Sequence, residues 1–169
     1  MKDFDERGMK LCRMQARLFV LSASKLKCSS PVFMRRFMLS GVASRMDRDS
    51  FLYESCTEDR ILQEIEEEFG PTNYGKEKYS TEELYWIGYL YRYWCYTYEK
   101  SSKQIYKIIK PNELRQLYYP YHSLDPSQAI ERILESKALG NEDYTRRGIE
   151  ILRRIMSEKS HSDQSAKKS

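Results

Sequence analysis

Few residues in this chain have the chemistry that catalysis requires. Cys95 and His122 form the one pair that could act as nucleophile and general base, and they lie far apart in the sequence. Cys95 also falls within an apolar helical segment, where a cysteine more often fills space in the core. The chain contains no phosphate-binding glycine motif, no G-x-S-x-G motif and no H-E-x-x-H motif. The sequence therefore predicts a protein that is not an enzyme.

Metal-ligating residues are equally sparse. The two histidines, His122 and His161, are too far apart in the sequence to indicate a metal site. The acidic run at 64–68 is typical of a solvated helix face. The cysteines are separated by long, irregular intervals, without a C-x-x-C pair: Cys12, Cys28, Cys56 and Cys95. We interpret them as reduced thiols, several of them buried, and we expect no metal and no cofactor.

Composition and charge restrict the class of protein further. The 169 residues carry a net charge of +4 and include only seven glycines and five prolines, which favours helices joined by short connections. A basic first third precedes the acidic segment 57–83, so these charges can neutralise each other, which weakens the case for nucleic acid. The most apolar stretch, 86–98, is shorter than the roughly 20 residues that a bilayer requires. We expect a cytoplasmic protein with no membrane segment.

Apolar periodicity and capping residues predict an all-α fold. The predicted helical segments are 4–27, 31–46, 57–69, 81–99, 102–110, 112–119, a helix that begins at 126 and ends at Gly140-Asn141, and a last helix over 142–157. Residues 72–79 are predicted to form an exposed loop. We expect one compact domain over 1–157, a bundle of about six or seven helices, and a disordered polar tail over 158–169.

The segment 81–99 is the most informative part of the sequence. Ser80 and Glu83 form an S-x-x-E capping box that starts this helix. At about 100° per residue, one face carries Trp86, Ile87, Leu90 and Trp94. Another face carries Tyr85, Tyr89, Tyr93 and Tyr96. Because the helix is apolar or aromatic nearly all round, it must be covered on more than one side, which places it at the centre of the bundle.

The abundance of tyrosine indicates a protein-binding surface. Tyrosine and tryptophan are enriched where a surface is apolar when covered yet tolerates water when free, and the chain has 14 tyrosines. Later helices of the same domain could also cover the tyrosine row of the 81–99 helix, the face at 85, 89, 93 and 96. The sequence therefore allows this row to be either a partner-binding surface or part of the core. The predicted partner-binding residues are Tyr85, Tyr89, Tyr93, Tyr96, Tyr118, Tyr119, Tyr121 and His122.

Two other functions fit parts of the pattern. The helices predicted over 81–119 have the lengths and spacing of a helix-turn-helix. However, the helix that would read DNA has only Asn112, Arg115 and Gln116 to contact base edges or phosphates. The basic residues that would support a DNA-binding regulator are Arg35, Arg36, Arg45, Arg146, Arg147, Arg153 and Arg154. A homo-oligomeric scaffold is the other alternative, with the tyrosine row pairing with itself across a two-fold axis.

Two stretches of sequence resemble a known group of proteins. They are YRYWCYTYEKSSKQIYKII at 91–109 and LYYPYHSLDP at 117–126. These stretches are similar to small helical proteins of Gram-positive gut bacteria that are encoded beside toxin-like genes, including genes resembling ADP-ribosyltransferases. The resemblance covers about residues 80–135. It implies an antitoxin or immunity role, in which the chain binds and neutralises a cognate toxin encoded nearby, and it identifies no catalytic residue. Operator DNA is a further partner that the resemblance allows, because antitoxins often repress their own operon, although nothing in these residues shows that this chain does so.

Overall fold

The computed structural model describes the backbone of residues 1–166 and the side chains up to 159, except those at positions 49, 53 and 144. Every regular element within these residues is helical and none is a strand, which confirms the predicted all-α class. The helices are α1 (Glu6–Lys25), α2 (Ser30–Leu39), α3 (Gly41–Met46), α4 (Glu58–Phe69), α5 (Thr81–Tyr98), α6 (Ser102–Ile108), α7 (Pro111–Tyr121) and α8 (Pro126–Ala166), and a 3-10 turn, η1 (Asp49–Tyr53), follows α3. The chain divides into two units, Met1–Ser127 and Gln128–Ser169.

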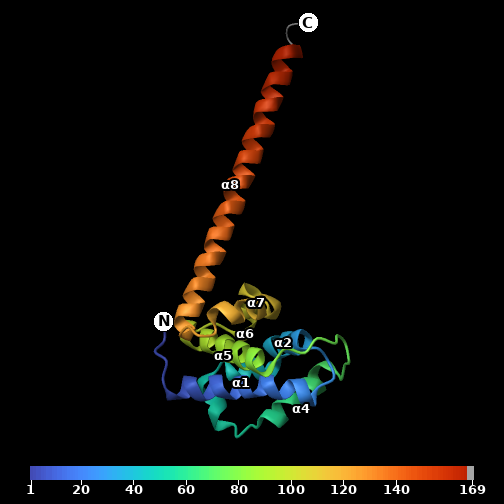
Figure 1. Ribbon diagram of the computed structural model, residues 1–169, viewed down its shortest axis with the longest axis vertical. Helices are drawn as coiled ribbons and strands as arrows, with labels where there is room; N and C mark the ends of the chain where they lie inside the picture. The colour runs from blue at the N-terminus through green and yellow to red at the C-terminus, as the bar shows by residue number, and fades with distance from the viewer. Residues whose placement is uncertain (167–169) are drawn as a thin grey trace. The chain divides into compact units, whose positions relative to one another are not determined.

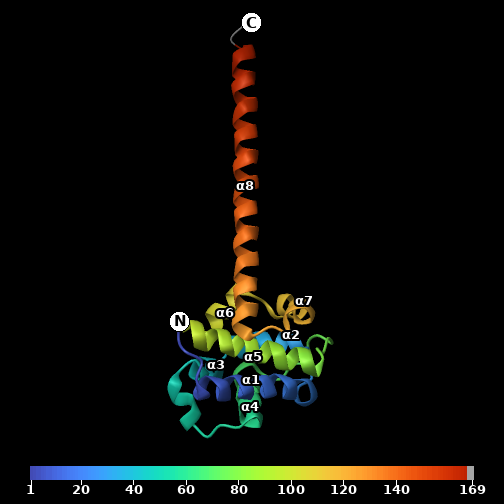
Figure 2. The ribbon, with the colours of Figure 1, turned by 60° about the vertical axis from the view of Figure 1, so that its left-hand side comes forward.

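Helix α5 is the central element of the first unit. It lies beside α1 in both ribbon views, with α4 on the far side of α1 and with α6 and α7 against α5 (Figures 1 and 2). Its buried residues include Leu84, Ile87, Leu90 and Trp94. The aromatic helix is therefore covered on more than one side, as its apolar circumference predicts.

A glycine allows α1 and α5 to approach each other closely. A Cβ atom added at Gly88 would lie 2.9 Å from the Gln15 carbonyl oxygen and 3.0 Å from the Ala16 Cα atom. Both of these are backbone atoms of α1, and they cannot move aside as a flexible side chain can. The absence of a side chain at position 88 therefore fixes how deeply the two helices pack.

The remainder of the core is strongly aromatic. Phe19 of α1 meets Phe33 and Phe37 of α2 edge to face, with ring centroids 5.5 and 5.3 Å apart. Tyr91 of α5 is fully buried, and its hydroxyl donates a hydrogen bond of 2.8 Å to the carbonyl oxygen of Ile109. This bond satisfies the polar end of the buried tyrosine and ties α5 to the end of α6.

A buried arginine joins four helical segments of the first unit. Arg92 of α5 is only 1% exposed. Its Nε donates to the Gln15 side chain of α1 at 2.7 Å, and its Nη1 forms an ion pair with Asp47 at the end of α3 at 2.7 Å. Its Nη2 donates to the Ser102 hydroxyl of α6 at 3.0 Å. Because a buried charge is tolerated only when it is paired and hydrogen-bonded, these partners determine where the four segments meet.

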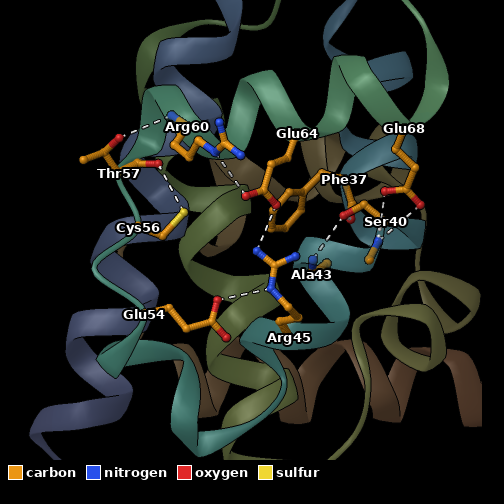
Figure 3. Close-up of polar contacts among 11 residues, drawn as sticks. Phe37, Ser40, Ala43, Arg45, Glu54, Cys56, Thr57, Arg60, Glu64 and Glu68 are labelled. Atoms are coloured by element: carbon orange, nitrogen blue, oxygen red, sulfur yellow. Dashed lines mark hydrogen bonds and ion pairs between the residues drawn. The ribbon is translucent and has the colours of Figure 1, made fainter.

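The helix predicted over 31–46 is divided at Ser40. The Ser40 hydroxyl accepts a hydrogen bond from the Ala43 amide at 3.1 Å and donates one to the Phe37 carbonyl at 2.6 Å (Figure 3). Glu68 of α4 accepts a hydrogen bond of 3.0 Å from the Gly41 amide. The serine thus ends α2 and caps α3, because its side chain competes with the helical ladder for backbone partners.

The connection between α4 and α5 follows the sequence prediction in part. Gly70 ends α4 with a φ of +81°, a conformation that favours glycine. The next residues are mostly exposed, as the predicted loop requires. Tyr79 is the exception: its ring is buried and its amide donates a hydrogen bond of 3.0 Å to the Ser30 hydroxyl. This contact attaches the loop to the start of α2.

Helix α8 continues where the sequence predicts a break. Residues 126–166 form one helix that passes through Gly140 and Asn141 without interruption. A glycine inside a helix costs only about 1 kcal/mol relative to alanine, and no proline follows it, so the predicted end at this pair is wrong. The helix also includes residues 158–166 of the predicted disordered tail, whereas 167–169 lie outside the described residues.

Candidate functional site: an aromatic groove

An aromatic groove lies between α5 and the end of α7. Its volume is about 630 Å³, and apolar surface makes up most of its lining. The lining residues are Thr81, Glu82, Tyr85, Trp86, Tyr89, Tyr118, His122, Leu124 and Pro126. Three consecutive turns of α5 therefore form one wall, and the end of α7 with the turn that follows it forms the other.

The capping box at the start of α5 holds this wall in place. The Ser80 hydroxyl accepts from the Glu83 amide at 3.2 Å, and the Glu83 carboxylate accepts from the Ser80 amide at 3.0 Å. The second oxygen of Glu83 accepts a hydrogen bond of 3.0 Å from Arg115 Nε of α7. One carboxylate thus caps α5 and also connects it to α7, so the two walls of the groove share an anchor.

Glu83 is held in its charged form by these contacts. Burial by itself raises the pKa of this carboxyl, but the hydrogen bonds from Ser80 and Arg115 outweigh it and bring the pKa below its ordinary value of 4.5. The Arg115 guanidinium is shared with Glu77, to which it also forms an ion pair. The anchor between the walls is therefore ionic near neutral pH.

Ring contacts arrange the aromatic side chains of the groove. The Tyr85 and Tyr89 rings stack along α5 with centroids 6.4 Å apart. Trp86 meets Tyr118 of α7 edge to face at 5.8 Å, and Tyr118 stacks on His122 at 4.6 Å. These rings are held before any ligand binds, which lowers the entropy that binding would cost.

Two polar groups at the groove, the Tyr89 phenol and the His122 ring, are available for hydrogen bonds. Burial raises the pKa of Tyr89 to about 12, so its phenol stays neutral and can donate a hydrogen bond. The Nδ1 atom of His122 lies 2.9 Å from the Tyr118 carbonyl oxygen and 3.0 Å from that of Tyr119. Since both oxygens are acceptors, Nδ1 carries the hydrogen, and in the neutral ring Nε2 is an acceptor.

The predicted tyrosine row is split between two environments. Tyr85, which is 40% exposed, and Tyr89 line the groove. Tyr93 instead packs against Phe4 with ring centroids 4.6 Å apart, and the Tyr96 hydroxyl donates a hydrogen bond of 2.6 Å to Asp5. The N-terminal segment therefore covers the second half of the row. The chain itself thus supplies contacts for Tyr93 and Tyr96, which the sequence left open, and binding of a partner or a second copy by any of the four tyrosines stays a prediction.

The α7 residues are divided in the same way. Tyr118 and His122 line the groove, whereas the largely exposed Tyr119 and the half-buried Tyr121 are not part of its lining. Trp86 also lines the groove, although helical periodicity assigns it to the same face as Ile87 and so did not predict it as a binding residue. The other lining residues that the sequence did not predict are Thr81, Glu82, Leu124 and Pro126. The single apolar residue in the polar turn 122–127, Leu124, was the one signal that could have extended the site.

Most cations proposed for DNA binding in the first unit have other partners. Arg45 lies between two carboxylates and pairs with Glu54 at 3.2 Å and with Glu64 at 2.8 Å (Figure 3). Arg36 donates a hydrogen bond to the Gly70 carbonyl oxygen. Arg115, which lies on the helix that would read DNA, is bound by Glu77 and Glu83 as described above. These contacts leave the exposed Arg35 as the remaining predicted cation of this unit.

The other predicted cations lie on α8. Arg146, Arg147, Arg153 and Arg154 are exposed. Arg154 lies 3.8 Å from the Glu158 carboxylate, one turn further along the helix. Acidic residues are interspersed among these arginines, so they do not form an uninterrupted basic surface. DNA binding stays a prediction, and the aromatic groove remains the better-formed site.

The residues considered for catalysis are not arranged for it. Cys95 is buried inside α5, and burial raises the pKa of its thiol to about 11, so it is not an activated nucleophile at neutral pH. His122 is hydrogen-bonded to its own helix, as described above. No group of three metal-ligating side chains occurs among the described residues. Within the same residues, none of the helices has the combined length and hydrophobicity of a membrane-spanning segment.

Comparisons with known proteins assign no family to the chain. No family model, no curated protein and no solved structure matches it. The geometry and chemistry of the groove are therefore the structural basis for a functional proposal.

Proposed function

We propose that this chain is a non-catalytic protein-binding module whose aromatic groove receives an apolar segment of a partner protein. The observation that carries the proposal is the set of ordered rings from Tyr85, Trp86, Tyr89 and Tyr118 around about 630 Å³ of open groove. Tyrosine and tryptophan are enriched among the few residues that dominate the binding energy of protein interfaces, which tend to lie in well-packed pockets.

The chemistry of the lining supports a protein partner over a small polar metabolite. Recognition of such a metabolite requires several polar groups that converge on it, whereas here the lining is mostly apolar and Glu82 is its acidic group. The neutral phenol of Tyr89 can donate to a backbone carbonyl of the partner. We expect the bound segment to contain one or two large apolar side chains and a basic residue that pairs with Glu82.

The partner that the proposal names is a cognate toxin encoded by an adjacent gene. Support for this part comes from the resemblance of residues 80–135 to proteins encoded beside toxin-like genes. An antitoxin of this type requires no catalytic residue, because it inactivates the toxin by covering or distorting its active site. A cytoplasmic location is part of the same proposal and agrees with the four cysteines being free thiols.

Copurification with the product of the adjacent gene tests this function. The wild-type chain should co-elute with that protein and neutralise its toxicity. Tyr85→Ala should weaken binding at least about tenfold, equivalent to about 1.4 kcal/mol, because it removes an exposed ring from the groove. Tyr74→Ala is the matched control, since Tyr74 is an exposed tyrosine on the loop before α5 and is not part of the groove. Equal binding by both variants, or no binding by the wild type, would contradict the proposal.

A further inference from the structure

The N-terminal segment of the chain occupies part of the tyrosine row on α5. This segment precedes α1, and its Lys2 amide donates a hydrogen bond of 2.7 Å to the Thr97 carbonyl oxygen. The Phe4 ring packs against Tyr93 and Tyr96, with ring centroids 4.6 and 6.4 Å apart. The second half of the row therefore holds a non-helical segment through an aromatic side chain.

Two charged residues near Phe4 in the sequence complete this contact. The Lys2 ammonium lies 4.1 Å from the centre of the Tyr96 ring, as a cation over an aromatic face. The Asp5 carboxylate, which directly follows Phe4, accepts a hydrogen bond of 2.6 Å from the Tyr96 hydroxyl. Hydrogen bonds to a charged group are stronger than those between neutral groups. The row thus contacts a basic residue, an aromatic ring and a carboxylate of one short segment.

The aromatic groove lies on the preceding turns of the same row and is open. Tyr85, Tyr89 and Tyr93 follow one another at intervals of four residues, so they lie along one face of α5. The groove offers the same kinds of group as the covered half of the row: aromatic rings, and the neutral phenol of Tyr89 as a hydrogen-bond donor. A segment with similar side chains therefore fits it.

Charges of opposite sign lie near the two ends of the groove along α5. Glu82 lines the end at the start of the helix. At the other end, the positive charge of Arg13, an exposed residue of α1, acts on the Tyr89 phenol. A carboxylate placed there would accept from the Tyr89 hydroxyl and would also be attracted by Arg13, so it binds more strongly than a backbone carbonyl. A basic residue would pair with Glu82.

The length of the groove sets the separation of these two charges in a bound segment. Glu82 and Tyr89 are seven residues apart on α5, which is about 10 Å along the helix axis at 1.5 Å per residue. Three residues of extended chain span about the same distance. Lys2 and Asp5 of the N-terminal segment are also three residues apart, with Phe4 between them.

We propose that the groove recognises an extended segment in which an aromatic residue stands between a basic and an acidic residue that are three positions apart. The inference rests on the proposed function and specifies the segment that the partner presents. The aromatic ring packs on Tyr85, Tyr89 and Tyr118, the basic residue pairs with Glu82, and the carboxylate accepts from the Tyr89 hydroxyl beside Arg13. The N-terminal segment shows the same chemistry on the neighbouring turns of α5.

Short synthetic peptides test this specificity on the full chain. The probes are the acetylated and amidated tetrapeptides Lys-Ala-Phe-Asp and Asp-Phe-Ala-Lys, which present the three groups in the two possible directions. NMR titration of the phenylalanine ring signals measures the dissociation constant. At least one probe should bind saturably. Replacing its aspartate with asparagine should raise the dissociation constant at least about threefold, and replacing its phenylalanine with alanine should raise it at least about tenfold.

Variants of the chain locate the bound peptide. Tyr89→Phe keeps the ring and removes the hydroxyl, so it should weaken binding of the aspartate peptide at least about threefold and leave binding of the asparagine peptide unchanged. Tyr74→Phe is the matched control, because Tyr74 is an exposed tyrosine outside the groove, and it should change neither. Tyr85→Ala should weaken binding of both peptides, because both occupy the groove and not the part of the row that Phe4 covers.

Three outcomes would overturn this specificity. They are the absence of saturable binding by both probes, equal affinities for the aspartate and asparagine peptides, and peptide binding that Tyr85→Ala leaves unchanged. The proposed function would still stand if the product of the adjacent gene bound through Tyr85. Conversely, if the peptides bind as expected but that gene product does not, the toxin partner is wrong and the specificity of the groove stands.

Discussion

Replacing Asp47 with alanine is expected to destabilise the fold by about 3 kcal/mol, because it leaves the guanidinium of Arg92 buried without its counter-charge. The Asp47 carboxylate accepts hydrogen bonds from Arg92 Nη1 at 2.7 Å, from the Ser102 amide at 3.0 Å and from the Ser102 hydroxyl at 2.7 Å. All three are lost in the variant. In the wild type, the Asp47 carboxylate therefore connects the end of α3 to α5 and to the start of α6.

The magnitude follows from the burial of the two partners. Removing one partner of a buried ion pair costs about 3–5 kcal/mol. Arg92 is 1% exposed, but the Asp47 side chain is 16% exposed, so water can partly replace the lost carboxylate. We therefore expect a value at the low end of that range. It also agrees with the loss of three hydrogen bonds at about 1 kcal/mol each.

Urea unfolding followed by circular dichroism measures this loss. With a slope of about 2 kcal/mol per molar urea, the midpoint should fall by about 1.5 M while the slope stays unchanged. Glu64→Ala is the matched control. Glu64 also forms an ion pair with an arginine at a helix junction, but Arg45 is half-exposed, so the loss should be below about 1 kcal/mol. Equal losses in the two variants would refute the argument from burial.

A double variant separates the ion pair from other effects of the substitution. Asp47→Ala combined with Arg92→Met removes both charges, so the penalty of an unpaired buried charge disappears. The double variant should lose at least about 1 kcal/mol less than the sum of the two single losses. Strictly additive losses would show that the two side chains do not stabilise each other.

Three further predictions concern other parts of the fold. Gly88→Ala should cost about 1–3 kcal/mol of unfolding free energy, because its Cβ would contact the backbone of α1, whereas Gly140→Ala in α8 should gain up to about 1 kcal/mol. The pKa of Glu83 is lowered in the folded state, so the stability that Glu83 contributes is present above pH 4.5 and is lost as the pH falls through the folded pKa. In acid unfolding, the Glu83→Gln variant should therefore lose less stability than the wild type. Thiol titration of the native protein should modify Cys56 first, because the other three cysteines are buried.

Local signals in the sequence account for most of the helix boundaries. The Ser80 capping box and the Thr57 cap start α5 and α4 where the structure has them, and Gly70 ends α4. These signals work because each satisfies backbone groups that a helix end leaves unpaired. Gly140 is the counterexample. A glycine ends a helix only where the chain beyond it gains from leaving the helix, and in α8 the chain continues helical on both sides.

The packing of particular side chains could not be predicted in this way. Helical periodicity identified α5 as a helix covered on several sides, but it gave no partner for Arg92, because Gln15 and Asp47 are 77 and 45 residues away in sequence. For the same reason it could not show that Phe4 and Asp5 cover Tyr93 and Tyr96. Contacts over such distances depend on the tertiary fold.

The sequence predicted only some of the residues that line the groove, because the rest of the lining also depends on the tertiary fold. Tyr85, Tyr89, Tyr118 and His122 were identified from the surplus of aromatic residues, and the structure brings them together. Trp86 was assigned to the core because it shares a face with Ile87. Its ring lies instead at the edge of that face, where it meets Tyr118 of α7. A helical wheel gives the direction of a side chain but does not say where the neighbouring helix ends.

The most direct test of the aromatic groove uses the two tryptophans of the chain. When the protein is labelled with 5-fluorotryptophan, fluorine NMR gives one signal from Trp86 in the groove and one from the fully buried Trp94, and the Trp86→Phe variant assigns them. Adding the unlabelled product of the adjacent gene should shift or broaden the Trp86 signal and leave the Trp94 signal in place. Binding of that protein with an unchanged Trp86 signal would show that the partner contacts another surface and would contradict the proposed role of the groove.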